Sequence, residues 1–248
     1  MKVLWSVHTS DGGRHFNEDA YYADSEKGVF IVADGMGGPH CGDSAAKHSC
    51  FYISEFLESI SLNQEATWAY ERKEELSYLE NVLRISFLIT NERLYSQALD
   101  EFQKEVMGTQ LVAAFLSGKK LVFGSVGCAR AYMFRGDYLQ QLTEDASYAK
   151  YKKIVPARVE KNMPLEVLGL QEKLNFVSLQ EKSCKPGDKY LLISDGISSV
   201  LKNEEIQKIM SRKTNDLHSL CEELIDIALS RNCLDNATAL VLEIPSEE

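Results

Sequence analysis

The sequence lacks the features that mark membrane, secreted and zinc-binding proteins. Its longest apolar runs are short, as at 111–116, so none could span a bilayer. The N-terminus enters a strand pattern without the apolar core of a signal peptide. The six cysteines include no Cys-x-x-Cys pair, and the five histidines show no metal-ligand spacing. We therefore expect a cytoplasmic protein with reduced thiols, no zinc and no membrane partner.

Positive charge is also scarce in this chain. Its 27 Lys and Arg residues face 37 Asp and Glu residues, which gives a net charge of −10. Such an acidic chain is not expected to have nucleic acid or an anionic membrane as its main partner. A basic segment at 150–161 is interpreted as a solvated face. The alternative is a surface that docks acidic or phosphorylated segments of a substrate.

The order of the predicted elements indicates one domain that covers residues 1–248. The length allows a single large core, and neither an internal repeat nor a linker is evident. Consecutive strands are predicted from 109 to 142 with no helix between them. At least nine strands are expected, too many for one open sheet, so we predict an α+β fold of two packed antiparallel sheets flanked by helices. The helices are expected near 43–57, 74–102, 204–210 and 215–228.

Three acidic residues are linked to apolar strands. Val29–Ala33 runs into Asp34, Tyr190–Ser194 runs into Asp195, and Asp235 comes just before a C-terminal strand. Glycines follow Asp34 closely, so we expect the backbone to turn there. Clustered carboxylates repel one another unless positive charge lies between them. Carboxylates, a glycine carbonyl and water are ligands of Mg²⁺ or Mn²⁺, so the pattern predicts a site for hard divalent cations.

Six motifs extend this pattern from about Thr9 to Ile244. They are Arg14-x-x-Asn17-Glu18-Asp19, Val32-Ala33-Asp34-Gly35-Met36-Gly37-Gly38, Met107-Gly108-Thr109, Leu142-Thr143-x-Asp145-x-Ser147, Pro186-Gly187-Asp188…Ser194-Asp195-Gly196 and Asp235-Asn236-Ala237-Thr238. In this order they resemble the metal-dependent type 2C Ser/Thr protein phosphatases, and the methionine after Asp34-Gly35 resembles the bacterial branch. The resemblance implies a four-layer αββα sandwich.

The resemblance also implies two Mn²⁺ or Mg²⁺ ions per chain. Asp34 would bridge the two ions, and a water activated between them would attack phosphorus. Arg14 would hold the substrate phosphate, because its planar fork suits two phosphate oxygens. The other implied ligands are Asp195 and Asp235 at the first ion and the Gly35 carbonyl and Glu18 at the second, with Asp19 and Asn236 behind the ligands.

Two positions depart from the family pattern. The family's Gly-Asp-Ser-Arg reads Gly127-Cys128-Ala129-Arg130 here, and Ser199 stands where a further acid is usual. Both changes remove ligands of a third metal site and leave those of the two-metal core. We therefore expect the third ion to bind weakly or not at all, with slower turnover.

The function expected from these residues is a Mn²⁺- or Mg²⁺-dependent protein Ser/Thr phosphatase. It would act as a monomer on phosphorylated proteins that are substrates of a Ser/Thr kinase. Two alternatives remain open: a non-catalytic phosphoprotein-binding regulatory module of the same fold, and a metal-dependent hydrolase of small phosphate esters. The retained Arg14, Glu18, Asp34, Asp195 and Asp235 favour catalysis, since a pure binder has no evident need for all of them.

Overall fold

A computed structural model describes residues 2–37, 40–62, 69–100, 107–147 and 163–246, so the basic segment 150–161 lies outside the described residues. Among the described residues, ten strands form two five-stranded sheets in which every pairing is antiparallel. The first sheet has the order β2 (Asp19–Asp24), β3 (Val29–Gly37), β4 (Met107–Ser117), β5 (Lys120–Val126) and β8 (Ser178–Ser183). The second has the order β1 (Leu4–Ser10), β10 (Ala237–Glu243), β9 (Lys189–Ile193), β6 (Arg130–Arg135) and β7 (Tyr138–Gln141).

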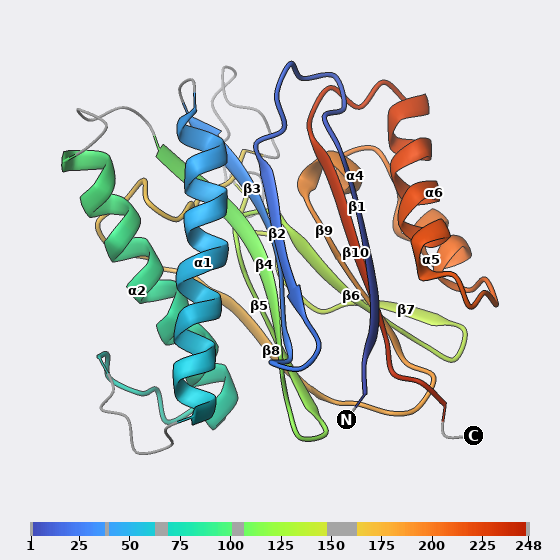
Figure 1. Cartoon of the computed structure of the whole chain (residues 1–248), viewed down its shortest axis with the longest axis horizontal. Helices are drawn as coiled ribbons and strands as arrows, with labels where there is room; N and C mark the ends of the chain where they lie inside the picture. Colours follow the sequence, from blue (N-terminus) through green and yellow to red (C-terminus); the bar gives the residue numbers. More distant parts are fainter. Residues whose placement is uncertain (1, 38–39, 63–68, 101–106, 148–162, 247–248) are drawn as a thin grey trace.

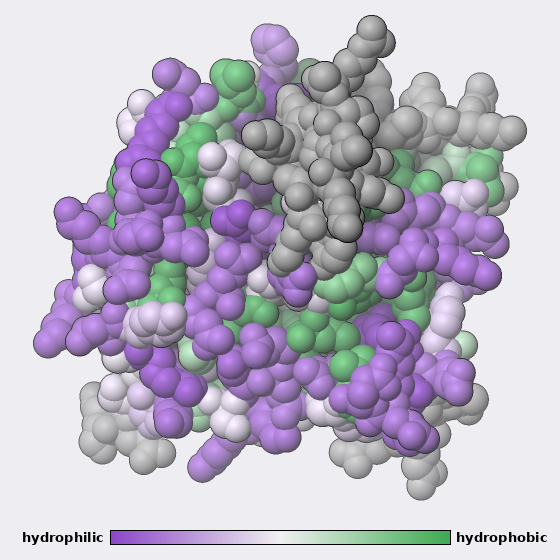
Figure 2. Space-filling model, turned by 180° about the vertical axis from the view of Figure 1, so that it is seen from behind, coloured by the Kyte–Doolittle hydropathy of each residue, from purple (hydrophilic) through white to green (hydrophobic). Residues whose placement is uncertain are grey.

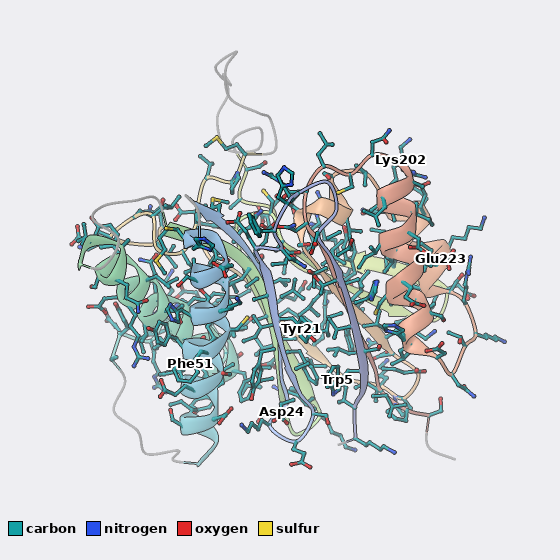
Figure 3. All side chains as sticks on the ribbon, turned by 45° about the horizontal axis from the view of Figure 1, so that its top comes forward. Trp5, Tyr21, Asp24, Phe51, Lys202 and Glu223 are labelled. Atoms are coloured by element: carbon teal, nitrogen blue, oxygen red, sulfur yellow. The ribbon has the colours of Figure 1, made fainter. Side chains whose placement is uncertain are left out.

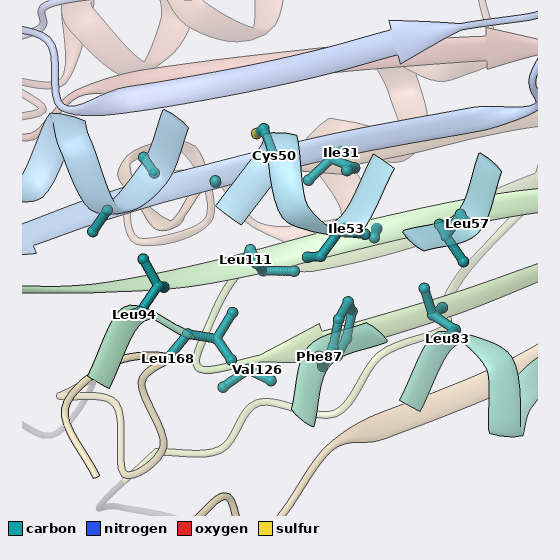
Figure 4. Packing of buried hydrophobic residues seen from close by; sticks show 14 of the residues in the cluster. Ile31, Cys50, Ile53, Leu57, Leu83, Phe87, Leu94, Leu111, Val126 and Leu168 are labelled. Atoms are coloured by element: carbon teal, nitrogen blue, oxygen red, sulfur yellow. The ribbon is translucent and has the colours of Figure 1, made fainter. Parts of the chain in front are cut away.

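Helices cover the outer face of each sheet, which confirms the αββα order of layers. The helices α1 (Cys41–Leu62) and α2 (Tyr78–Asp100) lie on the first sheet (Figure 1). The second sheet is covered by α5 (Asn203–Met210) and α6 (Leu217–Ser230), and the short α4 (Asp195–Ser198) comes directly after its central strand β9 (Figure 1). Ile53 and Leu57 of α1 and Phe87 of α2 pack against strand residues of the first sheet (Figure 4).

Alternation along β3 explains why this strand is apolar on both faces. Val29, Ile31 and Ala33 belong to the cluster under α1 and α2, whereas Phe30 and Val32 belong to the cluster between the two sheets. Side chains fill that inter-sheet layer (Figure 3). Because both faces of β3 are buried, its register is strongly specified, and so is the position of the residues that follow Ala33.

Two predicted elements begin later than the sequence indicates. Helix α2 begins at Tyr78 rather than near 74, because Ser77 and Glu80 form a capping box in which each side chain accepts from the other's backbone N–H, at 3.2 and 2.8 Å. Strand β8 begins at Ser178 rather than at Leu174. Leu174 and Val177 instead pack against the cluster under the helices, before the chain pairs with β5.

One face of the molecule is mainly polar. Seen from behind, the described residues present a mainly hydrophilic face with smaller apolar areas (Figure 2). None of the helices in the described ranges is both long enough and apolar enough to cross a membrane. The six cysteines all lie in described segments, and no disulfide joins any two of them.

Candidate active site

Asp34 lies inside strand β3 rather than at its end. Gly35, Met36 and Gly37 continue the pairing with β4, so the expectation of a turn after Asp34 is wrong. The glycine at 35 is needed for a close approach instead. A Cβ there would lie 2.0 Å from the carbonyl oxygen of Gly42, in the first turn of α1. The start of α1 therefore packs directly against the strand beside Asp34.

Asp195 lies where the sequence predicts it, directly beyond the apolar strand β9. Ser194 follows that strand, and Asp195 is the first residue of α4. Gly196 again permits a close approach, because a Cβ at this position would lie 2.0 Å from the carbonyl oxygen of Asn236. This contact brings the start of α4 against the segment that carries Asp235.

The structure brings Asp34 and Asp195 together through a residue that the motifs do not include. Gln110 of β4 is the cross-strand partner of Asp34 and is only 2% exposed. Its Nε2 donates to Asp34 Oδ2 at 3.0 Å and to Asp195 Oδ2 at 2.6 Å. The two carboxylates therefore share one amide nitrogen, although they come from different sheets. The sequence signal for Gln110 is an amide at the start of the apolar run 111–116.

Asp19 joins the two sheets behind this pair. It is the cross-strand partner of Asp34 on β2, and its Oδ2 accepts from Ser194 Oγ at 2.9 Å and from Thr238 Oγ1 at 2.6 Å. Among the atoms of the described residues, its buried Oδ1 finds no hydrogen-bond partner. An unsatisfied buried carboxylate oxygen is costly, which indicates that a polar ligand completes this region.

Asn236 connects the two loops that carry the remaining predicted residues. Its Nδ2 donates to the carbonyl oxygens of Asp11 and Phe16 at 2.9 and 3.0 Å, and its Oδ1 accepts from the Glu18 backbone N–H at 2.9 Å. Glu18 is thereby fixed next to Asp235. Its carboxylate also lies at the start of α1, since a Cβ on Gly42 would meet Glu18 Oε1 at 2.6 Å.

Arg14 pairs with Asp235 across the mouth of the site. Its Nε and one terminal nitrogen donate to the two oxygens of Asp235, each at 3.0 Å. The side chains of Arg14 and Asp235 are 57% and 41% exposed, so this ion pair is in contact with solvent. An exposed pair of this kind contributes little stability, which leaves the guanidinium available to another anion.

All the predicted ligands line one cavity of about 740 Å³, which we call the acidic cavity. Its wall includes Arg14, Glu18, Asp34, Gly35, Gln110, Asp195 and Asp235, and also the two departures, Cys128 and Ser199. Ser199 Oγ donates to the Gly196 carbonyl at 3.1 Å. The Cys128 backbone N–H donates to Gln110 Oε1 at 2.9 Å. Both replaced positions are thus next to the paired acids.

The acids of this cavity repel one another. Burial raises the pKa of Asp34 well above its usual range, and the charges of Asp195, Asp19 and Asp235 raise it further. Burial likewise raises the pKa of Asp195, and burial raises the pKa of Asp19 to about 7. Bound cations would reverse these shifts by favouring the ionised carboxylates.

The donor set fits Mn²⁺ or Mg²⁺. Within the described residues, no three Asp, Glu, His or Cys side chains converge closely enough to bind an ion without other ligands. Hard cations, however, keep several waters and take one or two carboxylates with carbonyl oxygens. The acidic cavity supplies such oxygens together with mutually repelling carboxylates and the unsatisfied Asp19 Oδ1. The described residues that line the cavity include two cysteines, Cys128 and Cys233, but no histidine, and the carboxylate and carbonyl oxygens around them suit a hard cation better than zinc.

Comparison with known proteins assigns the chain to a class of enzyme. The family model described as protein phosphatase 2C matches residues 8–232, so the chain belongs to the protein phosphatase 2C family. It is accordingly a phosphoprotein phosphatase of the Ser/Thr type, from a family that depends on Mn²⁺ or Mg²⁺.

Two bacterial relatives cover almost all of this chain. The Ser/Thr phosphatase stp of Listeria innocua is 30% identical over 241 residues, which are 93% of this chain and 91% of the relative. The Ser/Thr protein phosphatase PstP of Mycobacterium tuberculosis is 26% identical over 98% of this chain and 45% of its own length.

Solved structures share the fold. PppA of Pseudomonas aeruginosa, described as a key regulatory component of T6SS, superposes with a TM-score of 0.80 at 26% identity, over 98% of both chains. The catalytic domain of PstP, determined in complex with two manganese ions, superposes with a TM-score of 0.75 at 24% identity, over 98% of this chain and 99% of that domain. At this identity the second likeness supports the fold alone.

Proposed function

We propose that this phosphatase hydrolyses phosphoserine and phosphothreonine in proteins with two divalent cations, Mn²⁺ or Mg²⁺, held in the acidic cavity. The observation that carries the proposal is the buried pair of Asp34 and Asp195, which share Gln110 Nε2. Two buried carboxylates from different sheets are costly to hold together in the absence of positive charge, because burial raises the pKa of both and the charge of Asp195 raises the pKa of Asp34 further. A cation site explains why this chain keeps them.

The residues that would hold the ions lie around this pair. Asp34 would contact both ions, Asp195 and Asp235 would complete the first set of ligands, and the Gly35 carbonyl and Glu18 would serve the second. When bound, the ions would supply Lewis acidity and lower the pKa of water to near neutrality. Asp19 and Asn236 would position the ligands without contacting the ions. Asn236 accepts a hydrogen bond from the Glu18 backbone, and Asp19 of β2 accepts one from Ser194, which precedes α4.

Arg14 would bind the substrate phosphate. Its guanidinium offers a planar pair of N–H groups, which now meet the two oxygens of Asp235. A phosphate group presents oxygens that fit the same fork. Because Asp235 is also a proposed cation ligand, Arg14 would exchange its contact with Asp235 for the phosphate of the substrate.

Two cysteines among the described residues, Cys128 and Cys233, line the cavity, and neither is an activated nucleophile at neutral pH. Burial raises the pKa of the Cys233 thiol. Burial also raises the pKa of the Cys128 thiol to about 12, and the charges of Asp145 and Asp195 contribute to the rise. Reactive cysteines need the opposite shift, because the thiolate is the nucleophile. This electrostatic setting supports direct attack by water rather than a covalent phosphocysteine.

The third metal site is proposed to be weak. Cys128 and Ser199 stand on the cavity wall at the two positions where the family usually has acids. Neither a neutral buried thiol nor a hydroxyl that donates to the Gly196 carbonyl replaces a carboxylate ligand. We further infer that residues 1–248 act as one catalytic domain, as a monomer, on phosphorylated proteins. The non-catalytic alternative is not favoured, because the ligands of the two-metal core are retained.

The direct test is release of phosphate from a phosphothreonine peptide with and without Mn²⁺. Mn²⁺ should be required, and Asp34→Asn should reduce kcat/KM at least ~10²-fold, as expected when a group that stabilises transition-state charge is lost. Asp137→Asn in the exposed turn between β6 and β7 is the matched control and should retain full activity. Equal rates with and without metal would reject the mechanism, and no release by the wild type would favour the binding module.

A further inference from the structure

Gln110 occupies a defined position between the two paired acids. Both hydrogens of its Nε2 are used, one on Asp34 Oδ2 at 3.0 Å and the other on Asp195 Oδ2 at 2.6 Å. Its Oε1 accepts from the backbone N–H of Cys128 at 2.9 Å. The carboxamide of a residue that is 2% exposed thus makes three hydrogen bonds, two to carboxylates and one to the main chain.

The orientation of this amide is fixed by its three partners. In the reversed orientation, Oε1 would face two carboxylate oxygens and Nε2 would face a backbone N–H, so all three hydrogen bonds would be lost. The backbone of Gly127 also closes off one side of the Gln110 side chain. Gly127, with a φ of +90°, lies so close that a Cβ there would be 2.5 Å from Gln110 Cβ and 2.9 Å from Oε1. The amide therefore stays between the acids.

A fixed amide divides the oxygens of the two carboxylates between the protein and any bound ion. It holds Oδ2 of Asp34 and Oδ2 of Asp195. An ion cannot lie between those two atoms while the amide remains there, so it would use the lone pairs that the amide leaves open, foremost those of the other oxygen, Oδ1, of each acid. The donated hydrogen bonds also lower the repulsion between the two acids and fix the orientation of their side chains.

We propose that Gln110 is a positioning residue for the cation site: its amide holds one oxygen of Asp34 and one oxygen of Asp195 and reserves the other oxygen of each for a divalent cation. This inference rests on the proposed function, and it adds a residue that the six motifs do not contain. It also explains the hydrogen bond from the Cys128 backbone N–H to Gln110 Oε1, because this bond fixes the orientation of the amide.

The test compares the Mn²⁺ affinity of variants at position 110 by titration calorimetry on the full chain at pH 7.5. Gln110→Met keeps the length of the side chain and removes the donors. Its Kd for Mn²⁺ should be weaker by ~10–100-fold, the range typical when partners of metal ligands are lost. Gln110→Thr keeps a single hydroxyl proton, which can serve only one carboxylate at a time, so its Kd should lie between those of Gln110→Met and the wild type. At saturating Mn²⁺, kcat on the phosphothreonine peptide should change far less than Kd.

Gln207→Met is the matched control. Gln207 also loses a hydrogen bond on substitution, since its Nε2 donates to the Asp137 carbonyl at 3.0 Å, but it lies on α5 away from the acidic cavity. Its Mn²⁺ Kd should equal that of the wild type. Near-UV circular dichroism and Tm in EDTA establish that each variant is folded, and Gln110→Thr decides the question if Gln110→Met does not fold.

Three results would overturn the proposal. An unchanged Kd with a lowered Tm would make the amide a purely structural residue. A tighter Kd in Gln110→Met would mean that the amide occupies the position of an ion and blocks it. If the wild type fails to bind Mn²⁺, both this proposal and the proposed function are wrong. If the wild type and both position-110 variants bind Mn²⁺ with the same Kd, this proposal alone is wrong.

Discussion

The buried carboxyl of Asp19 provides a quantitative test of how the acidic cavity affects stability. Burial raises its pKa from 3.8, the value of an exposed aspartate, to about 7, against the opposing hydrogen bonds from Thr238 and Ser194. A difference of this size between the folded and unfolded chain corresponds to about 4 kcal/mol of unfolding free energy. We therefore expect Asp19→Asn to change both the stability of the ion-free protein and its dependence on pH.

The sign follows from the raised pKa. The folded protein binds the proton more tightly than the unfolded chain, so the stabilisation is fully present below pH 3.8 and is lost as pH rises through about 7. Asparagine stays uncharged at every pH, so the variant does not lose this stabilisation as pH rises. At pH 8 in EDTA, Asp19→Asn should exceed the wild type by up to about 4 kcal/mol, or roughly 10 °C in Tm for a chain of this size. At pH 4 the difference should be small.

Thermal unfolding in EDTA from pH 4 to pH 8 measures this effect, with Asp137→Asn as the control for an exposed aspartate. Mn²⁺ should then stabilise the wild type by mass action and stabilise Asp19→Asn less, because the carboxylate behind the ligands is missing. Identical pH profiles for the wild type and Asp19→Asn in EDTA would refute the claim that a strained buried acid lies at this site.

Two further predictions concern other positions. Burial alone would raise the pKa of Asp188, but hydrogen bonds from Arg135, the Lys185 backbone and Tyr190 lower it, so its stabilisation is present above pH 3.8 and is lost below. Asp188→Asn should therefore cost about 3 kcal/mol in urea unfolding at pH 7 and less at pH 3, and an equal cost at both would contradict the ion-pair explanation. The double variant Cys128→Asp/Ser199→Asp should have a lower Tm in EDTA than the wild type, because it buries more negative charge. Mn²⁺ should stabilise it more than the wild type and raise its phosphopeptide turnover above the wild-type rate. Unchanged turnover would contradict the proposed defect at the third site.

The layers of the fold could be predicted because they depend on local patterns. The apolar run before Asp34 and the absence of helices between 109 and 142 already indicate packed antiparallel sheets, and αββα sandwich order is confirmed. The limits of β3 were predicted wrongly. The glycines after Asp34 look like a turn, whereas Gly35 is required by the approach of Gly42 from α1, a contact that no local pattern reveals.

The site could be predicted only where a motif names its residues. Gln110 lies outside the motifs, and its partners Asp34 and Asp195 are 76 and 85 residues away along the chain. The double hydrogen bond of Asp19 to Ser194 and Thr238 likewise joins residues from opposite ends of the sequence. Such partners depend on how the two sheets pack, and sequence patterning fixes that packing only in outline.

The central claim is that acids from distant parts of the chain bind a pair of divalent ions. Anomalous diffraction from crystals grown with Mn²⁺ tests it most directly. Two peaks should lie within about 4 Å of each other in the acidic cavity, with Asp34 contacting both. A cavity without Mn²⁺, or ions bound away from Asp34 and Asp195, would contradict it.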